Sequence, residues 1–234
     1  MTFIVRHVHI PATTDESLSI AHLSDLHVRT GGRLLSALHA HLEQDPPDVV
    51  AFTGDGFDLP AGARRVEGFF REVASRWPVV FVLGNHERFW GKRIWEPLTR
   101  IPGCHFLERE PFRHRSGTTR FEFTDLSATQ APPEPGTVRV ILHHDPEDLP
   151  AQGVDGTPLA LAGHLHGGQV VWWKNRAGAL FPGSWLYRNL SDKKRLGSTW
   201  LVVSRGLGDT LPLRWNCPHE IVRIRLGGDP IEGS

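Results

Sequence analysis

Five short blocks of metal-ligating side chains, each framed by glycine or apolar residues, constrain this chain more than any other feature. They are residues 25–27, 54–58, 84–87, 143–145 and 163–166. A pair of divalent cations that share a ligand needs about seven or eight oxygen and imidazole donors, brought together from several strand ends. The five blocks supply that number, so the sequence predicts a site for two metal ions.

Composition bounds the scaffold. The chain has 234 residues, of which 39% are hydrophobic, and this is enough for one large α/β domain spanning residues 1–234. The 26 basic and 26 acidic residues cancel. Such a chain lacks the basic face that coats nucleic acid, so we expect no stable nucleic-acid partner, and a DNA exonuclease is disfavoured.

Cysteine usage and the N-terminal residues bear on the compartment. Cys104 and Cys217 lie far apart and form no CxxC pair, which argues against a disulfide framework or a thiolate metal site and favours a reducing compartment. Residues 1–20 contain charged side chains and no long apolar run. The sequence therefore predicts neither a signal peptide nor a membrane-spanning helix, and a cytoplasmic location is expected.

The first half of the chain alternates strands with helices. Apolar runs predict strands at 18–23, 48–53 and 79–83, and apolar residues at helical spacing predict helices at 32–42 and 63–77. Strands that are apolar throughout indicate a sheet covered on both faces, and ligands of such sheets collect at the carboxyl ends of the strands. The first three polar blocks follow these ends.

From Gly103 onward the pattern changes to shorter alternating strands, and only residues 146–151 look helical. We expect strands at 120–123, 137–142, 159–162, 170–173, 200–203 and 221–226. These strands predict a second sheet packed on the first. The expected fold class is α/β, with two packed mixed β-sheets flanked by helices in a four-layer sandwich.

The first two polar blocks offer carboxylates and one imidazole. Asp25 and His27 alternate across one residue, so at a strand end both side chains point to one face and can hold one ion. An aspartate before a helix is more often a cap, and this alternative stays open for Asp25. Asp55 follows a glycine at the next strand end, where the absent Cβ allows a close approach, and its carboxylate can bridge two cations. Asp58 is interpreted as a residue that orders the loop.

The third block combines an amide, an imidazole and a carboxylate. The Asn85 side chain offers a neutral oxygen suited to the more exposed ion. The adjacent His86 then remains free to face the substrate. Glu87 is interpreted as an anchor for the loop.

The last two blocks contain paired histidines. His143 and His144 end one expected strand, and alternation allows only one of them to face the metals. His164 and His166 alternate on one face, between glycines and directly after an apolar strand. This last pattern favours metal ligands over core histidines.

The five blocks, in this order, resemble the calcineurin-like metallophosphoesterase superfamily. Within it, residues 163–169, 204–208 and 211–221 resemble the bacterial YkuE/YaeI-type phosphodiesterases. The resemblance covers the chain from about residue 18 to residue 226. The chain differs from such relatives at residues 87–90, where it has Glu-Arg-Phe-Trp and they usually show an aspartate and two tyrosines. This difference concerns the substrate pocket.

The resemblance implies a ligand set for each metal. The first metal would be held by Asp25, His27, Asp55 and His166, and the second by Asp55, Asn85, His144 and His164. Asp55 would then bridge the two. His144 is preferred over His143 because the family pattern is a histidine, a small polar residue and a proline, as at residues 144–146.

The chemistry expected of such a site is hydrolysis. The two cations would share a bridging solvent whose pKa falls toward about 7, so that a metal-bridging hydroxide attacks phosphorus in line. Asp55 and His86 are the expected catalytic residues, with His86 protonating the leaving oxygen or steadying the phosphoryl group. Imidazole and carboxylate ligands suit divalent manganese, iron or zinc, and manganese is the first choice.

Substrate-binding residues are expected at Asn85, His86, Arg88 and Arg205. Arg88 follows the metal loop and is expected to line the pocket. Arg205 lies in a glycine-rich loop, where it could bind a second phosphate or simply be a surface residue.

Two aromatic pairs also bear on the substrate. Phe89 and Trp90 either line the pocket or pack in the core. Trp172 and Trp173 are adjacent on an expected strand, so one should face inward and the other outward. An exposed tryptophan near the site would suit a lipid-like substrate at a membrane surface.

Three functional interpretations follow, in order of preference. The first is a phosphodiesterase that hydrolyses a small diester or nucleotide. The second is a pyrophosphatase in peripheral contact with a membrane, acting on a nucleotide-linked lipid of the UDP-diacylglucosamine type, and exposed apolar surface beside the site would favour it. The third is a noncatalytic scaffold, which would be expected to have lost ligands or His86.

Overall fold

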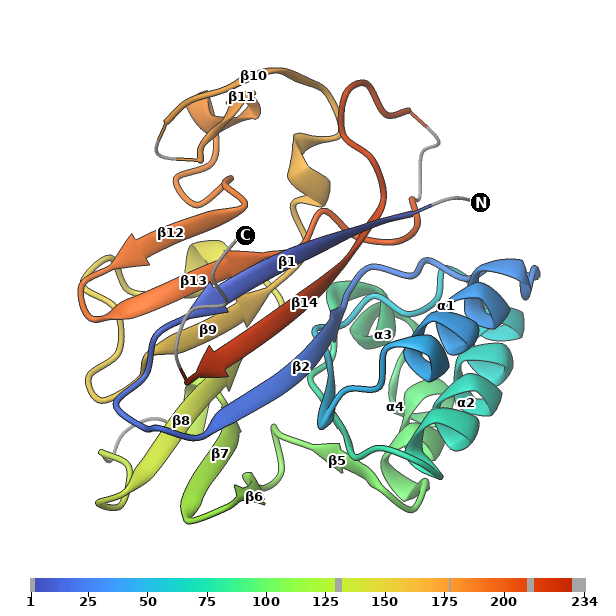
Figure 1. The fold of residues 1–234 in the computed structure, drawn as a ribbon. Helices are drawn as coiled ribbons and strands as arrows, with labels where there is room; N and C mark the ends of the chain where they lie inside the picture. Colours follow the sequence, from blue (N-terminus) through green and yellow to red (C-terminus); the bar gives the residue numbers. More distant parts are fainter. Residues whose placement is uncertain (1–2, 129–131, 177, 210–212, 229–234) are drawn as a thin grey trace.

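Two six-stranded β-sheets form the body of the computed structural model, which describes residues 3–128, 132–176, 178–209 and 213–228 (Figure 1). The first sheet has the order β1 (Ile4–Ile10), β14 (Glu220–Gly227), β2 (Ser17–Leu23), β3 (Val49–Phe52), β4 (Val79–Phe81) and β5 (Cys104–Phe106). The second has the order β12 (Lys193–Leu196), β13 (Thr199–Val203), β9 (Leu159–Ala162), β8 (Thr137–Leu142), β7 (Thr119–Asp125) and β6 (Phe112–Ser116). A separate two-stranded ribbon pairs β10 (Val171–Lys174) with β11 (Leu180–Pro182).

The main apolar core joins side chains of the two sheets. It contains Ile20, Val49 and Val80 from the first sheet, together with Phe121, Val140 and Leu161 from the second. Neighbouring residues of β3, such as Val50 and Phe52, belong instead to the core under the helices. The central strands are therefore buried on both faces, as their continuous apolar runs predict.

The four α-helices of the described residues pack on the first sheet alone (Figure 1). They are α1 (Arg33–Gln44), α2 (Pro60–Ala74), α3 (Asn85–Trp90) and α4 (Lys92–Trp95). The first two bury Leu38, Leu42, Val66 and Phe70 at the helical spacing that predicted them. None of the helices in the described ranges is long and apolar enough to cross a bilayer.

The outer face of the second sheet carries a small core around Leu149. The helix predicted at 146–151 is wrong, because only a 3₁₀ turn forms there, at Pro146–Asp148. Pro150 disfavours helical backbone at Leu149, which is extended with ψ 132°. The fold class of two mixed sheets flanked by helices is nevertheless confirmed.

Two strand assignments also need correction. The strand predicted at 221–226 for the second sheet is β14 of the first sheet, where it pairs parallel with β1 and antiparallel with β2. Strand β10 leaves both sheets for the ribbon, whose register shifts between Val171 and Trp173. Trp172 and Trp173 are both exposed as a result, so the expectation that one of them faces inward is wrong. The periodicity of a local sequence does not predict which distant strands pair with each other.

The topology brings the polar blocks together. Strands β2, β3 and β4 run parallel in the first sheet, and β7, β8, β9 and β13 run parallel in the second. The segments that follow β2, β3, β4, β8 and β9 begin with the five predicted blocks. Because parallel strands present their carboxyl ends at one edge, each sheet delivers its blocks to a single place.

We predict that two glycines of α2 respond oppositely to alanine. A Cβ at Gly62 would lie 1.8 Å from the Val28 carbonyl oxygen, whereas a Cβ at exposed Gly68 would meet nothing within 4 Å. Gly68→Ala should raise the free energy of unfolding by about 1 kcal/mol, because alanine favours the helix. Gly62→Ala should lower it by about 2 kcal/mol through overpacking. Urea unfolding of both variants measures this, and equal stabilities would contradict the close packing of α2 on the Val28 loop.

Candidate metal centre

One group of donors comes from the segments after β2 and β9. The Nε2 atoms of His27 and His166 lie 3.1 Å apart, and His166 Nε2 lies 3.7 Å from Asp25 Oδ1. One ligand atom from each of the three residues lies within 4.8 Å of the others. Helix α1 begins eight residues after Asp25, with Gly32 as its N-cap, so Asp25 does not cap it.

A second group comes from the segments after β3, β4, β8 and β9. His144 Nε2 lies 3.0 Å from Asn85 Oδ1, 3.1 Å from His164 Nδ1 and 3.3 Å from Asp55 Oδ2. The same Asp55 oxygen lies 4.0 Å from His27 Nε2 of the first group. Asp55 therefore stands between the two groups, and the structure brings together all seven residues expected as ligands.

Hydrogen bonds at the Nδ1 atoms of two histidines leave their Nε2 atoms available as metal ligands. His144 Nδ1 donates to the Thr53 carbonyl at 2.7 Å, so a neutral His144 presents a lone pair at Nε2. His27 Nδ1 likewise donates to the Asp58 carboxylate at 2.6 Å. Each Nε2 thus faces other side-chain atoms that can ligate a metal ion. Ligands of one cation with bonds of about 2.0–2.2 Å lie about 3 to 3.5 Å apart, so this donor set fits a metal ion at each group.

Electrostatics at His144 agree with a cation at this place. Burial lowers the pKa of His144, but the hydrogen bond and charge of Asp55 together raise it to about 9. The surroundings therefore favour a positive charge at this point. A divalent cation supplies that charge without a proton on the imidazole.

The backbone of the ligand loops is unusual. Five of the seven expected ligands have positive φ, with values of 51° at Asp25, 44° at His27, 57° at Asp55, 67° at His164 and 49° at His166. Residues other than glycine adopt this region uncommonly, and such conformations cluster at functional sites. The loops are also tightly packed, since a Cβ at Gly84 would lie 2.0 Å from Asp55 Oδ1.

Glu87 holds two of these loops together. Its buried carboxylate accepts hydrogen bonds from the backbone N–H groups of Asp55, Gly56 and Gly84 at 2.8, 2.6 and 2.8 Å. Burial and the nearby charge of Asp55 raise the pKa of Glu87. The contacts match the interpretation of Glu87 as a loop anchor.

Asp58 connects a ligand with the residue expected to face the substrate. Its Oδ1 lies 2.6 Å from His27 Nδ1 and 3.0 Å from His86 Nδ1, and its Oδ2 accepts from Arg29 Nε at 3.0 Å. The rings of His27 and His86 meet edge to face with centroids 4.7 Å apart. Asp58 thereby fixes the orientation of both imidazoles.

Three residues near His166 escaped the sequence analysis. Asp209 Oδ1 lies 3.5 Å from His166 Nδ1, and Asp209 also pairs with Arg214 at 2.7 Å and with His219 at 2.8 Å. Burial raises the pKa of Asp209, but these three partners hold it well below its usual range. No local pattern marks these residues, because they are distant from His166 in the sequence.

A cavity of about 460 Å³ opens onto the donors. Its lining includes His27, Asp55, Asn85, His86, His164 and His166, and on another side Gln169 and Tyr187. The His86 side chain is 26% exposed, so it is accessible from this cavity while its Nδ1 faces Asp58.

Sequence comparison assigns the family. The profile of the calcineurin-like phosphoesterases matches residues 18–187. The chain belongs to this family. The resemblance carried by the five blocks is therefore confirmed.

Individual relatives agree with this assignment. The phosphoesterase is 28% identical over 175 residues to the uncharacterised metallophosphoesterase YkoQ of Bacillus subtilis, covering 68% of this chain and 64% of that relative. The chain thus spans just under two thirds of YkoQ. It is 26% identical over 223 residues to phosphodiesterase YaeI of Escherichia coli, covering 88% of this chain and 81% of YaeI. A purple acid phosphatase from yellow lupin seeds shares the fold, with a TM-score of 0.50 and 15% identity over 87% of this chain and 47% of that one.

Two arginines expected to bind substrate have other partners in this phosphoesterase. Arg88 pairs with Glu108 at 2.7 Å. Arg205 donates two hydrogen bonds of 2.8 Å to Asp192 and is largely buried, so the structure does not bring its guanidinium to the cavity. Of the expected substrate-binding residues, only Asn85 and His86 line it.

The structure also shows the surroundings of His143, Phe89 and Trp90, for which the sequence allowed two alternatives. His143 pairs with Asp125 and Asp148 and is not part of either donor group. Trp90 packs against the core and donates to the Asp58 carbonyl at 2.9 Å, whereas Phe89 is exposed. Of the two aromatic residues, Trp90 therefore packs in the core and Phe89 does not.

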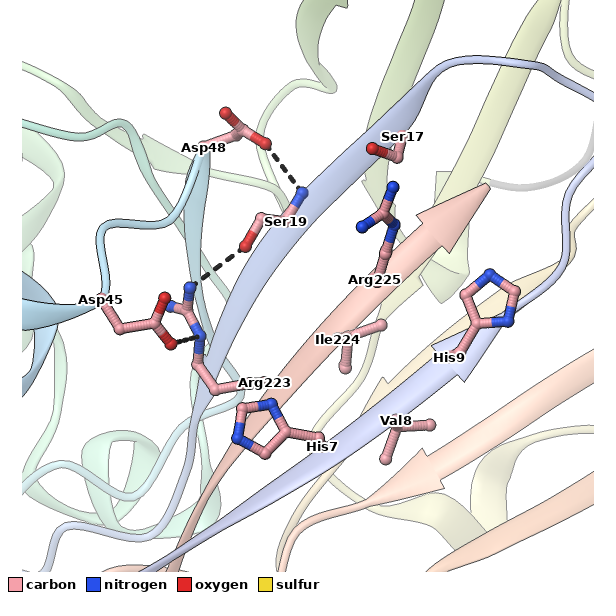
Figure 2. Close-up of a pocket in the computed structure, with 10 residues that line it drawn as sticks. All are labelled: His7, Val8, His9, Ser17, Ser19, Asp45, Asp48, Arg223, Ile224 and Arg225. Carbon is pink, nitrogen blue, oxygen red and sulfur yellow. Dashed lines mark hydrogen bonds and ion pairs between the residues drawn. The ribbon is translucent and has the colours of Figure 1, made fainter. Parts of the chain in front are cut away.

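A second cavity, of about 390 Å³, lies over β1, β14 and β2 (Figure 2). Its carboxylates are already engaged, since Asp45 pairs with Arg223 at 3.0 Å and Asp48 accepts from the Ser19 N–H at 2.7 Å. These residues are absent from the donor groups found in the described part of the chain. Of the two cavities, only the first opens onto donor groups of the described residues.

We predict a pH-dependent contribution of Asp192 to stability. Burial raises the pKa of Asp192, but the hydrogen bond from Arg205 and the charges of Arg6 and Arg205 bring it down to about 2. Since the unfolded pKa is near 3.9, the carboxylate contributes roughly 2 kcal/mol above pH 4, and this is lost as the pH falls toward 2. Asp192→Asn should remove this contribution to the free energy of unfolding.

Urea unfolding at pH 7 and at pH 3 measures the difference. Asp192→Asn should be clearly less stable than wild type at pH 7, and the gap should narrow at pH 3. Asp15→Asn, a change at an exposed carboxylate, is the control and should be neutral at both. A gap that is unchanged at pH 3 would contradict the role assigned to the Asp192 charge.

Proposed function

We propose that the chain is a phosphodiesterase that uses two divalent metal ions to hydrolyse a small diester or nucleotide. The observation that carries the proposal is the meeting of two donor groups at Asp55. A relative named phosphodiesterase, YaeI, aligned over most of this chain, supports the choice of a diester.

In this proposal each metal has its own ligands and shares Asp55. Asp25, His27, Asp55 and His166 hold the first ion, and Asp55, Asn85, His144 and His164 hold the second. Mixed imidazole and carboxylate donors suit manganese, iron and zinc, with manganese preferred. When bound, the two ions supply Lewis acidity toward the phosphoryl oxygens and an acidified water as nucleophile.

His86 is the residue of this chain proposed to act on the leaving group. Its Nδ1 faces the Asp58 carboxylate at 3.0 Å, so Nε2 is the ring nitrogen available to a substrate. A ring held in this way is placed to donate from Nε2 to the leaving oxygen. A good leaving group departs without being protonated. With such a substrate, His86 acts by binding the phosphoryl oxygens.

Asn85 is proposed to serve both metal and substrate. Its Oδ1 faces His144 Nε2 at 3.0 Å, among the donors of the second group. The amide NH₂ of the same side chain remains available to donate to a phosphoryl oxygen. Orientation by the metal ligands would fix this donor in place.

A second candidate is a pyrophosphatase that acts on a nucleotide-linked lipid at a membrane surface. One observation favours it: exposed apolar side chains adjoin the cavity. Tyr187 lines the cavity, and the preceding Trp185 and Leu186 are exposed. A noncatalytic scaffold is disfavoured, because the chain retains all seven expected ligands and His86.

We predict that activity requires the metals and the Asp55 carboxylate. Wild type should hydrolyse bis-p-nitrophenyl phosphate with added manganese, more readily than p-nitrophenyl phosphate, and should lose activity in EDTA. Asp55→Asn should bind fewer ions and lose at least about 1,000-fold in kcat, because an amide cannot bridge two cations as a carboxylate does. Metal analysis and kinetics measure this, with Asp15→Asn as the control. Full activity in EDTA would contradict the proposal.

We predict that the effect of His86→Ala depends on the leaving group. A general acid contributes about 10² to 10⁴ in rate, and most where the leaving oxygen is basic. His86→Ala should therefore lose far more kcat on a phenyl diester than on a p-nitrophenyl diester, while its metal content stays that of wild type. Equal losses on both substrates would assign His86 an electrostatic role only.

A further inference from the structure

The ribbon of β10 and β11 carries an unusual concentration of exposed apolar side chains. Trp172, Trp173, Trp185, Leu186 and Tyr187 are 61, 46, 66, 84 and 44% exposed. They come from β10 and from the segment that follows β11. We name these five residues the aromatic face. Large exposed apolar patches on a folded protein mark interaction sites.

The rings of this face are ordered by one another. Trp173 stacks on Phe181 with centroids 5.1 Å apart and planes at 7°, and Trp185 meets both rings edge to face at 6.0 Å. Trp172 lies 6.3 Å from Trp173. The exposed rings therefore form a fixed surface that a partner can meet at little cost in conformational entropy.

The neighbouring loop extends the surface. The Trp215 N–H donates to the Gln169 carbonyl, and the Trp215 carbonyl accepts from the N–H of Val171, the first residue of β10. Arg214 points inward to His166, whereas its neighbours Leu213 and Trp215 are 67 and 69% exposed. The same stretch of chain thus supports the metal centre and adds apolar area outside it.

Charge on this part of the chain is one-sided. Residues 163–191 include Lys174, Arg176 and Arg188 and not a single aspartate or glutamate, although acidic and basic residues balance over the whole chain. All three basic residues are exposed, but Lys174 pairs with Asp192 at 2.7 Å, and Arg188 donates to the carbonyls of Glu147 and Leu149 at 2.9 Å. Arg176 forms no ion pair within the described part of the chain and is the basic side chain left for an external partner. An anionic surface would complement this charge.

The indole groups add a third feature. Within the described residues, the N–H groups of Trp172, Trp173 and Trp185 have no hydrogen-bond acceptor. Apolar rings with unpaired polar edges, bordered by basic side chains, are typical of the interface between water and lipid.

We propose that the aromatic face docks the protein on the surface of an anionic lipid bilayer. Its rings enter the interface, and the exposed Arg176 meets the anionic headgroups. Because Tyr187 belongs both to this face and to the lining of the metal cavity, docking turns the cavity toward the bilayer. Docking rests on this surface and does not depend on hydrolysis.

Sedimentation with lipid vesicles tests the proposal. Full-length wild type should bind vesicles of phosphatidylcholine with phosphatidylglycerol, and bind vesicles of phosphatidylcholine alone more weakly. Trp172→Ala with Trp185→Ala should weaken binding at least about tenfold, because two large apolar side chains no longer enter the interface. Trp→Phe at both positions should retain part of the binding and shows that the ribbon is folded.

Charge and active-site variants complete the test. Arg176→Glu should weaken binding to anionic vesicles about tenfold, whereas Arg115→Glu, on β6 far from the ribbon, should bind as wild type. Asp55→Asn should also bind as wild type, so that failure to dock is distinguished from failure to hydrolyse. Hydrolysis of a soluble diester should be unchanged in the Trp172 and Trp185 variants.

Two results would overturn the proposal. One is a failure of the wild type to sediment with anionic vesicles, or sedimentation of the double alanine variant to the same extent as the wild type. The other is a wild-type dimer that becomes a monomer in the double alanine variant, with no lipid binding in either. That result would assign the aromatic face to contact between two copies of the chain.

Discussion

The carboxylate of Asp55 is the constraint on which the rest of the site depends. Burial raises the pKa of Asp55, but the hydrogen bond and charge of His144, with the His86 N–H, bring it down to about 2, so it remains ionised. The backbone of Asp55 is held in place by Glu87, whose carboxylate accepts hydrogen bonds from the backbone N–H groups of Asp55 and Gly84. A buried negative charge held between two imidazole groups is stable only if positive charge lies close by. The ionised Asp55 carboxylate is therefore consistent with the proposed metal ions on either side of it.

Holding the donors together has a conformational cost. Positive φ at five ligands disfavours each loop by itself, and the surrounding structure must oppose that preference. The two sheets supply this opposition through a shared apolar core and through parallel strands that end beside each other. Contacts between the loops do the rest: the Asp25 carboxylate accepts from the His164 N–H at 3.1 Å, which ties the first sheet to the second.

Much of this arrangement could be predicted from sequence, because the pattern is local. Apolar runs located β2, β3, β4, β8 and β9, and the blocks after them contain all seven residues that converge. Contacts between distant segments could not be predicted. Arg205 lies in a glycine-rich loop typical of phosphate binding, yet Asp192 takes its guanidinium. Asp209 and Arg214 contact His166 although they are distant from it in the sequence. The register shift that exposes both Trp172 and Trp173 breaks the alternation on which the expectation relied.

One segment links the two surfaces of the molecule. Residues 163–191 begin with His164 and His166, continue through β10 and β11, and end after Tyr187. Its small core of Leu165, Val171, Leu180, Leu190 and Cys217 is separate from the cores of the two sheets. A segment with so few buried residues has limited stability of its own, so ligands at either end contribute to its order. Metal ions held by its histidines would fix one end, and a partner bound to the aromatic face would fix the other. The metal site and the aromatic face are thus built on opposite ends of one short stretch of chain.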